Sequence, residues 1–205
     1  DAFEDPSVLR ILEQVAAQVA SAMERGNLLR IAQSSATESQ QLYEVTSDLA
    51  EATDSESILE AIARHALPDV PARAEIAVFI ADPETGAAYD WLEVVAALSR
   101  QTPKPFMAVG NRLPSDEFPA LQLLGDERLF ICHNVAEDPR IDPTIRDDYL
   151  EQGVRGLVIA ELGTGVAATE KIGLVQVRLS EPYVLSQSEC RLYDTIADQA
   201  AVVLS

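Results

Sequence analysis

Apolar residues near the N-terminus of the chain recur with helical spacing. Between positions 8 and 23 they fall three and four residues apart, which is the stripe of an amphipathic helix. Asp5 followed by Pro6 is a start signal, because proline in the first turn loses no backbone donor that the helix needs. Apolar residues resume after a gap, so we predict one long helix that is broken near Ser34 and Ser35.

Three further helices carry recognisable capping residues. Thr53 and Glu56 have the spacing of a capping box, which predicts a helix from position 54 to about position 67. Asp142 precedes Pro143 and caps a helix that a left-handed glycine ends at position 153. Ser186 and Glu189 form a second capping box, which opens the last helix.

The middle of the chain has the pattern of strands. Segments rich in Ile, Val and Phe and bounded by turn residues predict five strands. They are residues 75–81, 88–98, 128–133, 155–162 and 171–179.

Turns and prolines decide how these strands are joined. The turn composition of residues 82–86 joins the first two strands as a hairpin, and the last two form a second hairpin. Four prolines exclude a long regular element from residues 99–125, although a short helix fits at 115–124. Hairpins make a sheet antiparallel, so we predict an α+β fold with a central antiparallel sheet of five to six strands and helices packed on it.

The first and last helices resemble one another. Shifting the first by 181 positions places Arg10 on Arg191 and Gln18 on Gln199, with matching apolar positions around them. Any two alanine-rich amphipathic helices share such a stripe, but the polar identities favour a repeat. We therefore interpret residues 1–37 as a linker helix that closes a preceding copy of the domain, and residues 38–205 as the domain itself.

Charge and cysteine usage exclude several classes of function. The 205 residues carry 34 acidic and 15 basic side chains, a formal net charge of −19 that repels nucleic acids and anionic membrane surfaces. No apolar run is long enough to span a bilayer. The two cysteines, Cys132 and Cys190, show no spacing typical of a zinc site or a disulfide framework, so we expect a cytoplasmic protein.

Several segments together resemble the GAF domain, a small-molecule sensor module of histidine kinases, cyclic-nucleotide enzymes and phytochromes. They are residues 74–81, 109–114 (VGNRLP), 134–140 (NVAEDPR), 149–156 (YLEQGVRG) and 196–201 (IADQAA). The resemblance covers about residues 38–205. It implies a central antiparallel sheet with the terminal helices on one face and a ligand pocket, under the crossover helices and loops, on the other.

No catalytic, metal or cofactor site is indicated. Residues 163–168 fit the GxGxxA form of a dinucleotide fingerprint, but a strand follows where the fingerprint needs a helix. The pair Cys132 and His133 lies in a strand, unlike the bilin-anchoring pair of phytochrome-related GAF domains, so we interpret Cys132 as a small buried hydrophobe. Neither bilin, haem nor nucleotide is expected, the ligand remains unknown, and the fragment is expected to be non-catalytic.

The resemblance implies a mostly apolar pocket with polar anchors. Its candidate lining residues are Trp91, Phe106, Phe118, Phe130, Ile141, Tyr149 and Val158. The candidate anchors are Arg112, His133 and Arg155. Arg155 is the first to test, because an arginine at a strand start in so acidic a chain suits a carboxylate or phosphate.

These inferences predict a regulatory domain that binds a small molecule and relays binding through its terminal helices, within a multi-sensor histidine kinase. The apolar stripes of the terminal helices predict a homodimer, because two copies can pair them as a parallel bundle. Three alternatives remain open. The first is a ligand-free module for spacing and dimerisation, and the second is a regulatory domain of a cyclic-nucleotide enzyme or a transcription activator. The third is a small-molecule enzyme on the same fold, which would require turnover that is lost on mutation of Cys132 or His133.

Overall fold

The computed structural model describes residues 6–67, 69–80, 84, 89–101, 107–164 and 170–204. It divides into two compact units, residues 1–41 and 42–205. The first unit is the greater part of helix α1 (Pro6–Glu51), and the last turns of the same helix belong to the second unit.

Helix α1 is continuous, so the predicted break near Ser34 and Ser35 is wrong. The polar residues of this stretch are accommodated inside the helix. The hydroxyl of Thr37 donates to the Gln33 carbonyl at 3.0 Å, and that of Ser39 donates to the Ser35 carbonyl at 2.9 Å. Hydroxyls bonded to the preceding turn do not compete for backbone groups outside the helix, so the chain continues without interruption.

The second unit is built on six strands. They are β1 (Ala72–Ile80), β2 (Trp91–Arg100), β3 (Arg112–Pro114), β4 (Leu129–Cys132), β5 (Gly156–Thr164) and β6 (Glu170–Leu179). All pairings are antiparallel, in the order β3-β2-β1-β6-β5-β4, so β1 and β6 are the central strands. This confirms the predicted α+β class. The unpredicted β3 is a short edge strand that ends on a proline, a position that such a strand tolerates.

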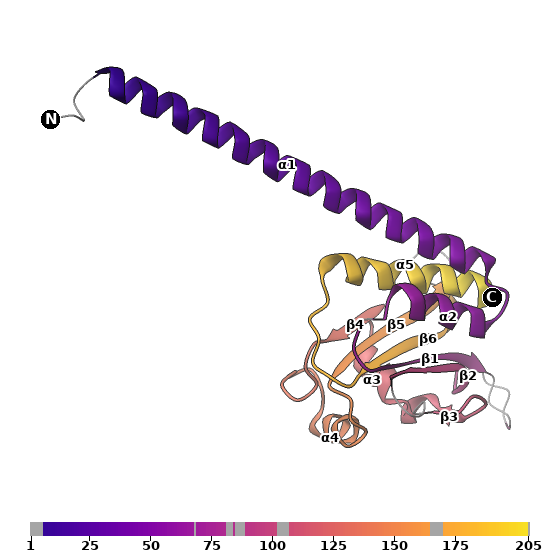
Figure 1. Ribbon diagram of the computed structural model, residues 1–205. Helices are drawn as coiled ribbons and strands as arrows, with labels where there is room; N and C mark the ends of the chain where they lie inside the picture. The colour runs from indigo at the N-terminus through magenta and orange to yellow at the C-terminus, as the bar shows by residue number, and fades with distance from the viewer. Residues whose placement is uncertain are drawn as a thin grey trace. The chain divides into compact units, whose positions relative to one another are not determined.

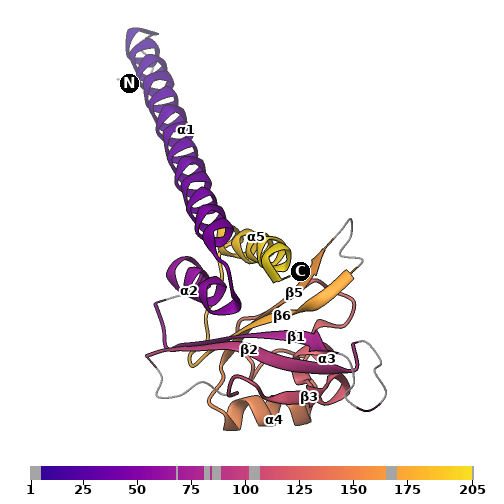
Figure 2. The same cartoon turned by 90° about the vertical axis from the view of Figure 1, so that its right-hand side faces the viewer.

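Helices cover both faces of the sheet. The short helix η1 (Ser115–Glu117) is followed by α3 (Pro119–Leu124) and later by α4 (Pro143–Glu151). Helices α2 (Ser55–His65) and α5 (Gln187–Leu204) lie on one face, and α3 and α4 lie on the other (Figures 1 and 2).

The capping residues fix where these helices begin. Asp142 accepts a hydrogen bond from the backbone of Thr144 at 2.8 Å, and the backbone of Ser186 donates to Glu189 at 2.7 Å, as predicted. The box at α2 lies one residue later than expected. Asp54, not Thr53, is the N-cap, and its partner is Ser57, whose N–H donates to the Asp54 carboxylate at 2.8 Å. An aspartate accepts this bond as readily as a threonine, so spacing alone does not choose between them.

Strand alternation sorts the side chains into two cores. On the face covered by α2 and α5, Val45 and Leu49 from the end of α1 pack with these two helices and with every second residue of β1, β5 and β6. On the opposite face, strand residues pack with α3, α4 and the segments that join them. The sheet is therefore buried on both sides, and each central strand contributes to both cores. The predicted turn at residues 82–86 lies mainly outside the described residues.

Candidate ligand site on the sheet

Four polar side chains occupy the α4-facing side of the two central strands. Arg73 and Glu75 alternate on β1 with residues that face the other core, and Gln176 and Arg178 do the same on β6. The register places Arg73 opposite Arg178 and Glu75 opposite Gln176. These four residues, called the polar quartet below, therefore form a two-by-two array in the middle of the sheet.

The quartet is buried and internally connected. Glu75, Gln176 and Arg178 are each at most 3% exposed. Arg178 donates to the Gln176 side-chain oxygen at 2.8 Å and lies 3.5 Å from a Glu75 carboxylate oxygen. Buried charges are tolerated when they are paired, so the Glu75 carboxylate and the Arg178 guanidinium make each other's burial possible.

Helix α4 closes the quartet from above. The Gln176 amide donates to the Tyr149 hydroxyl at 2.8 Å, and the Arg178 guanidinium lies 5.6 Å from the centre of the Tyr149 ring. Just after the helix, the Gln152 carbonyl accepts a 2.8 Å bond from Arg73. Burial raises the pKa of Tyr149 and lowers that of Arg178, and the neighbouring Glu75 carboxylate opposes the second shift. The raised pKa keeps the Tyr149 phenol neutral, and Arg178 keeps its charge because a guanidinium is not deprotonated in proteins.

Part of the hydrogen-bonding capacity of this region is unused. Within the described part of the chain, no group hydrogen-bonds Arg73 Nε, Glu75 Oε2 or Ser99 Oγ, although all three atoms are buried. Ser99 pairs with Arg73 in the β1–β2 register, so the three groups lie on the same side of neighbouring strands. The other Glu75 oxygen accepts from the Met107 backbone at 3.3 Å. Buried polar groups are normally satisfied, so this set suits a polar guest or ordered water.

The structure brings together four of the ten predicted site residues. Phe118, Phe130, Ile141 and Tyr149 are all buried in the α4-facing core. Val158 is buried in the opposite core, because it alternates with Leu157 and Ile159 along β5. Phe106 lies outside the described residues.

The remaining predicted residues lie elsewhere. Trp91 is half-buried at the start of β2, where its neighbour Leu92 enters the α4-facing core. Arg112 is exposed and pairs with Glu93 at 2.8 Å. His133 is exposed, with Nδ1 at 3.1 Å from the Tyr183 carbonyl.

Arg155 hydrogen-bonds to backbone carbonyls near the end of α4. Its guanidinium donates to the carbonyl oxygens of Leu150 and Val154, both at 3.1 Å. Leu150 belongs to the last turn of α4, and its carbonyl also accepts from the Gly153 backbone at 3.1 Å. Arg155 therefore ties the C-terminal end of α4 to the start of β5.

The sequence did contain a signal for the quartet. Arg73 with Glu75, and Gln176 with Arg178, are polar pairs at alternate positions of strands that are otherwise apolar. Because strand alternation places such pairs on one face, they marked a polar strip inside a buried sheet. The sequence did not show that β1 and β6 lie side by side. The array formed by the two pairs was therefore not predictable.

Cys132 is fully buried in β4, in agreement with its interpretation as a small hydrophobe. Burial raises its pKa to about 12, with a further contribution from the Asp138 carboxylate. A thiol that stays protonated is a poor nucleophile.

Neither a metal centre nor a membrane span is found among the residues that the structure describes. They contain no cluster of three or more His, Cys, Asp or Glu side chains arranged to hold an ion. None of their helices combines the length and apolarity needed to cross a bilayer.

Comparison with solved structures identifies the fold. A phycocyanobilin-bound GAF domain from a cyanobacterial phytochrome is 21% identical over 80% of this chain and 92% of that chain, with a TM-score of 0.55. A phycoerythrobilin-bound GAF domain from a cyanobacterial phytochrome is 21% identical over 81% of this chain and 92% of that chain, with a TM-score of 0.56. The chromophore-binding domain of a Stigmatella aurantiaca phytochrome is 14% identical over 78% of this chain and 57% of that chain, with a TM-score of 0.58.

The six-stranded antiparallel sheet with helices on both faces is thus a known α+β architecture. The fold is that of the GAF domain, as the sequence resemblance predicted. No family model matches the sequence, and no curated protein matches it.

Proposed function

We propose that this chain is a regulatory domain of a signalling protein and that it binds a small molecule at the polar quartet. The observation that carries the proposal is a set of buried groups on the α4-facing side of the sheet that no described group hydrogen-bonds. They are Arg73 Nε, Ser99 Oγ and Glu75 Oε2, the last of which lies 3.5 Å from the Arg178 guanidinium. A buried group without a hydrogen bond costs about 1–3 kcal/mol, so Arg73 Nε and Ser99 Oγ gain most from a suitable ligand.

The groups define the chemistry of the ligand. Glu75 accepts hydrogen bonds, whereas Arg73 donates them and Ser99 does either. A ligand that satisfies all three presents a donor beside an acceptor, as amides, amino acids and nucleobases do. Tyr149 and Phe118 supply apolar surface in the same core. We therefore infer a small polar molecule with an apolar portion.

The central strands provide a route to the terminal helices. On β6, Gln176 and Arg178 alternate with Val175, Val177 and Leu179, which pack in the core beneath α2 and α5. A ligand that shifts the strand on one side therefore changes the packing on the other. For regulation, the ligand must bind one arrangement of the helices more tightly than the other.

The parent protein that we propose is a dimeric multi-sensor histidine kinase. The bilin-bound cyanobacterial GAF domains support small-molecule binding on this fold, and exposed apolar side chains on α1 support helix pairing between two copies. Because Cys132 is buried and its thiol protonated, we propose a ligand that is bound without a covalent bond.

Native mass spectrometry of the purified chain tests the proposal. We expect a bound small molecule that is released on denaturation and lost in Glu75→Gln. Glu93→Gln is the matched control, because Glu93 is an ion-paired glutamate on the neighbouring strand β2. A chain that carries no small molecule, and that no amino acid or nucleobase stabilises against heat, contradicts the proposal.

The second candidate function is a ligand-free module for spacing and dimerisation. It is favoured by the tightness of the α4-facing core, where Val135, Val154 and Ile159 have no exposed surface. Such a module predicts that Glu75→Gln changes stability alone and leaves the mass of the native complex equal to that of the polypeptide.

A further inference from the structure

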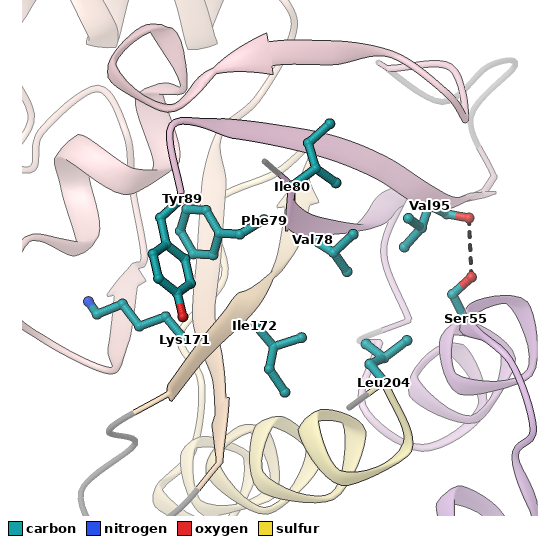
Figure 3. Close-up of a pocket in the computed structure, with 9 residues that line it drawn as sticks. All are labelled: Ser55, Val78, Phe79, Ile80, Tyr89, Val95, Lys171, Ile172 and Leu204. Carbon is teal, nitrogen blue, oxygen red and sulfur yellow. Dashed lines mark hydrogen bonds between the residues drawn. The ribbon is translucent and has the colours of Figure 1, made fainter. Parts of the chain in front are cut away.

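A pocket of about 470 Å³ opens where the two central strands separate. The pairing of β1 with β6 ends at Val78 and Gly173, but β1 continues to Ile80 and β6 begins three residues before the glycine. The space between the diverging ends is an open hollow, bordered by Leu204 from the last turn of α5 and by Ser55 from the first turn of α2 (Figure 3).

Backbone irregularities account for the separation. The β1–β2 register shifts between Ile76 and Ala77, and the β5–β6 register shifts between Leu162 and Gly163. Bulges bend strands and increase their twist, so each hairpin turns away from the other. At Gly173 the two strands are pressed together, since a Cβ there would lie 2.1 Å from the Ala77 carbonyl oxygen. Close approach at this point and divergence beyond it create the hollow.

The lining is mainly apolar. It consists of Val78, Phe79, Ile80, Val95, Ile172 and Leu204, with polar atoms from Ser55, Tyr89 and Lys171. Two of the three polar groups are already engaged. Ser55 donates to the Val95 carbonyl at 3.2 Å, and the Lys171 ammonium lies 2.6 Å from the Glu161 carboxylate. Among the described lining residues, the Tyr89 hydroxyl is the polar side-chain group left to recognise a ligand.

Tyr89 is held in an unusual conformation at one end of the pocket. Its φ is +69°, in the left-handed region that favours glycine. Its ring meets Phe79 edge to face, with 5.4 Å between the centroids (Figure 3). A bulky residue in this region is strained, and such strain concentrates at ligand sites. The strain is a second observation, independent of the cavity, that points to binding.

We propose that this pocket binds a neutral, largely apolar small molecule with one group that hydrogen-bonds to Tyr89. Its volume lies within the range of small-molecule sites. An anion is disfavoured because the chain carries a formal charge of −19 and Glu161 already neutralises Lys171. The site goes beyond the proposed function, because its lining shares no residue with the polar quartet.

Occupancy of this pocket acts directly on the terminal helix. Leu204 lies in the last turn of α5, and it faces Ile172 of β6 and Val78 of β1 across the hollow (Figure 3). A ligand that fills the hollow adds contacts between this turn and the sheet. It therefore strengthens the packing of this part of α5 on the sheet.

Fluorescence of N-phenylnaphthylamine, a neutral apolar probe with one N–H donor, tests the site. The chain's single tryptophan, Trp91, pairs with Ile80 across β1 and β2, so energy transfer from Trp91 reports a probe bound nearby. We expect saturable binding with energy transfer. Ile172→Phe, which fills the pocket, should weaken binding about tenfold or more, and Tyr89→Phe, which removes one hydrogen bond, about three- to tenfold.

The matched control is Val184→Phe, since Val184 is 77% exposed and does not line the pocket. It should leave probe binding unchanged. Methyl NMR of the unaltered chain gives an answer even if Ile172→Phe fails to fold. The probe should shift the methyl signals of Val78, Val95 and Leu204 and leave Val184 unaffected.

Two results overturn the inference. One is an absence of saturable binding, or binding that Ile172→Phe leaves intact in a folded protein. The other is a set of pocket methyl signals that move with protein concentration and not with the probe, which assigns the surface to a second copy of the chain. Neither result affects the quartet, whose test is retention of a small molecule that depends on Glu75.

Discussion

The Asp138 carboxylate holds the segment after β4 in place. Arg140 donates to it at 2.6 and 3.0 Å, reaches the Ile131 carbonyl and covers the Phe130 ring at 4.4 Å. Hydrogen bonding to Arg140 lowers the pKa of Asp138 from 3.8 to about 2. Protonation of Asp138 therefore weakens contacts at the edge of the α4-facing core.

This shift predicts an acid-dependent loss of stability. A depressed folded-state pKa stabilises the fold above the unfolded value of 3.8, and the contribution is lost as the pH falls toward about 2. Asp138→Asn should cost about 2 kcal/mol at neutral pH and progressively less below pH 4. Urea unfolding across this pH range measures it. The control is Asn at exposed Asp116, and a loss for Asp138→Asn that does not change with pH contradicts the prediction.

Gly173 is required by the close approach of the central strands. A methyl group there would meet the Ala77 carbonyl oxygen at 2.1 Å and the Val78 Cα at 2.7 Å, both of them backbone atoms. We expect Gly173→Ala to cost at least about 2–3 kcal/mol of unfolding free energy, measured by denaturant titration. Gly26→Ala, where a methyl meets nothing within 4 Å, should cost nothing. Equal stabilities of the two variants would refute this account.

At the scale of elements, Arg155 decides how firmly α4 is held. Arg155→Ala removes two hydrogen bonds from the guanidinium to carbonyls at and beyond the end of the helix. We expect faster hydrogen exchange over Pro143–Glu151 and a loss of about 1–2 kcal/mol. Arg112→Ala, which removes an exposed ion pair, should change neither by much. If α4 exchanges at the same rate in Arg155→Ala, the arginine is free to serve as a ligand anchor, as the sequence suggested.

The elements themselves were largely predictable, and the exceptions have local causes. The helices that begin at Asp142 and Ser186 follow directly from their capping residues. The false break in α1 arose because a gap in the apolar pattern indicated the end of a helix, whereas the polar residues of this stretch bond their hydroxyls to the preceding turn. Strand β3 was missed because three residues are too few to show the alternation of apolar and polar residues typical of a strand. Its pairing with β2 defines it as a strand.

At the scale of the whole molecule, the exposed apolar residues of α1 predict self-association. Val19 is 52% exposed and Leu28 is 59% exposed, and they lie on opposite sides of the helix. Val19 belongs to the stripe between positions 8 and 23, so Val19→Glu should shift the dimer toward monomer by about tenfold or more in dissociation constant. Light scattering over a concentration series measures the shift. Leu28→Glu is the control, and an equal effect of both variants, or a chain that is monomeric throughout, contradicts this interface.

The sequence by itself determined the type and order of the elements, the antiparallel sheet and the GAF resemblance, because periodicity, caps and turns are local properties of the chain. It also proposed Phe118, Phe130, Ile141 and Tyr149 as lining of one pocket, and the structure buries these four in one core. The tertiary structure alone decided that Val158 faces the other way, that Arg73, Glu75, Gln176 and Arg178 meet, and that a hollow opens beside Leu204. These features depend on strand register, and a shift of one residue would exchange the two faces of every strand.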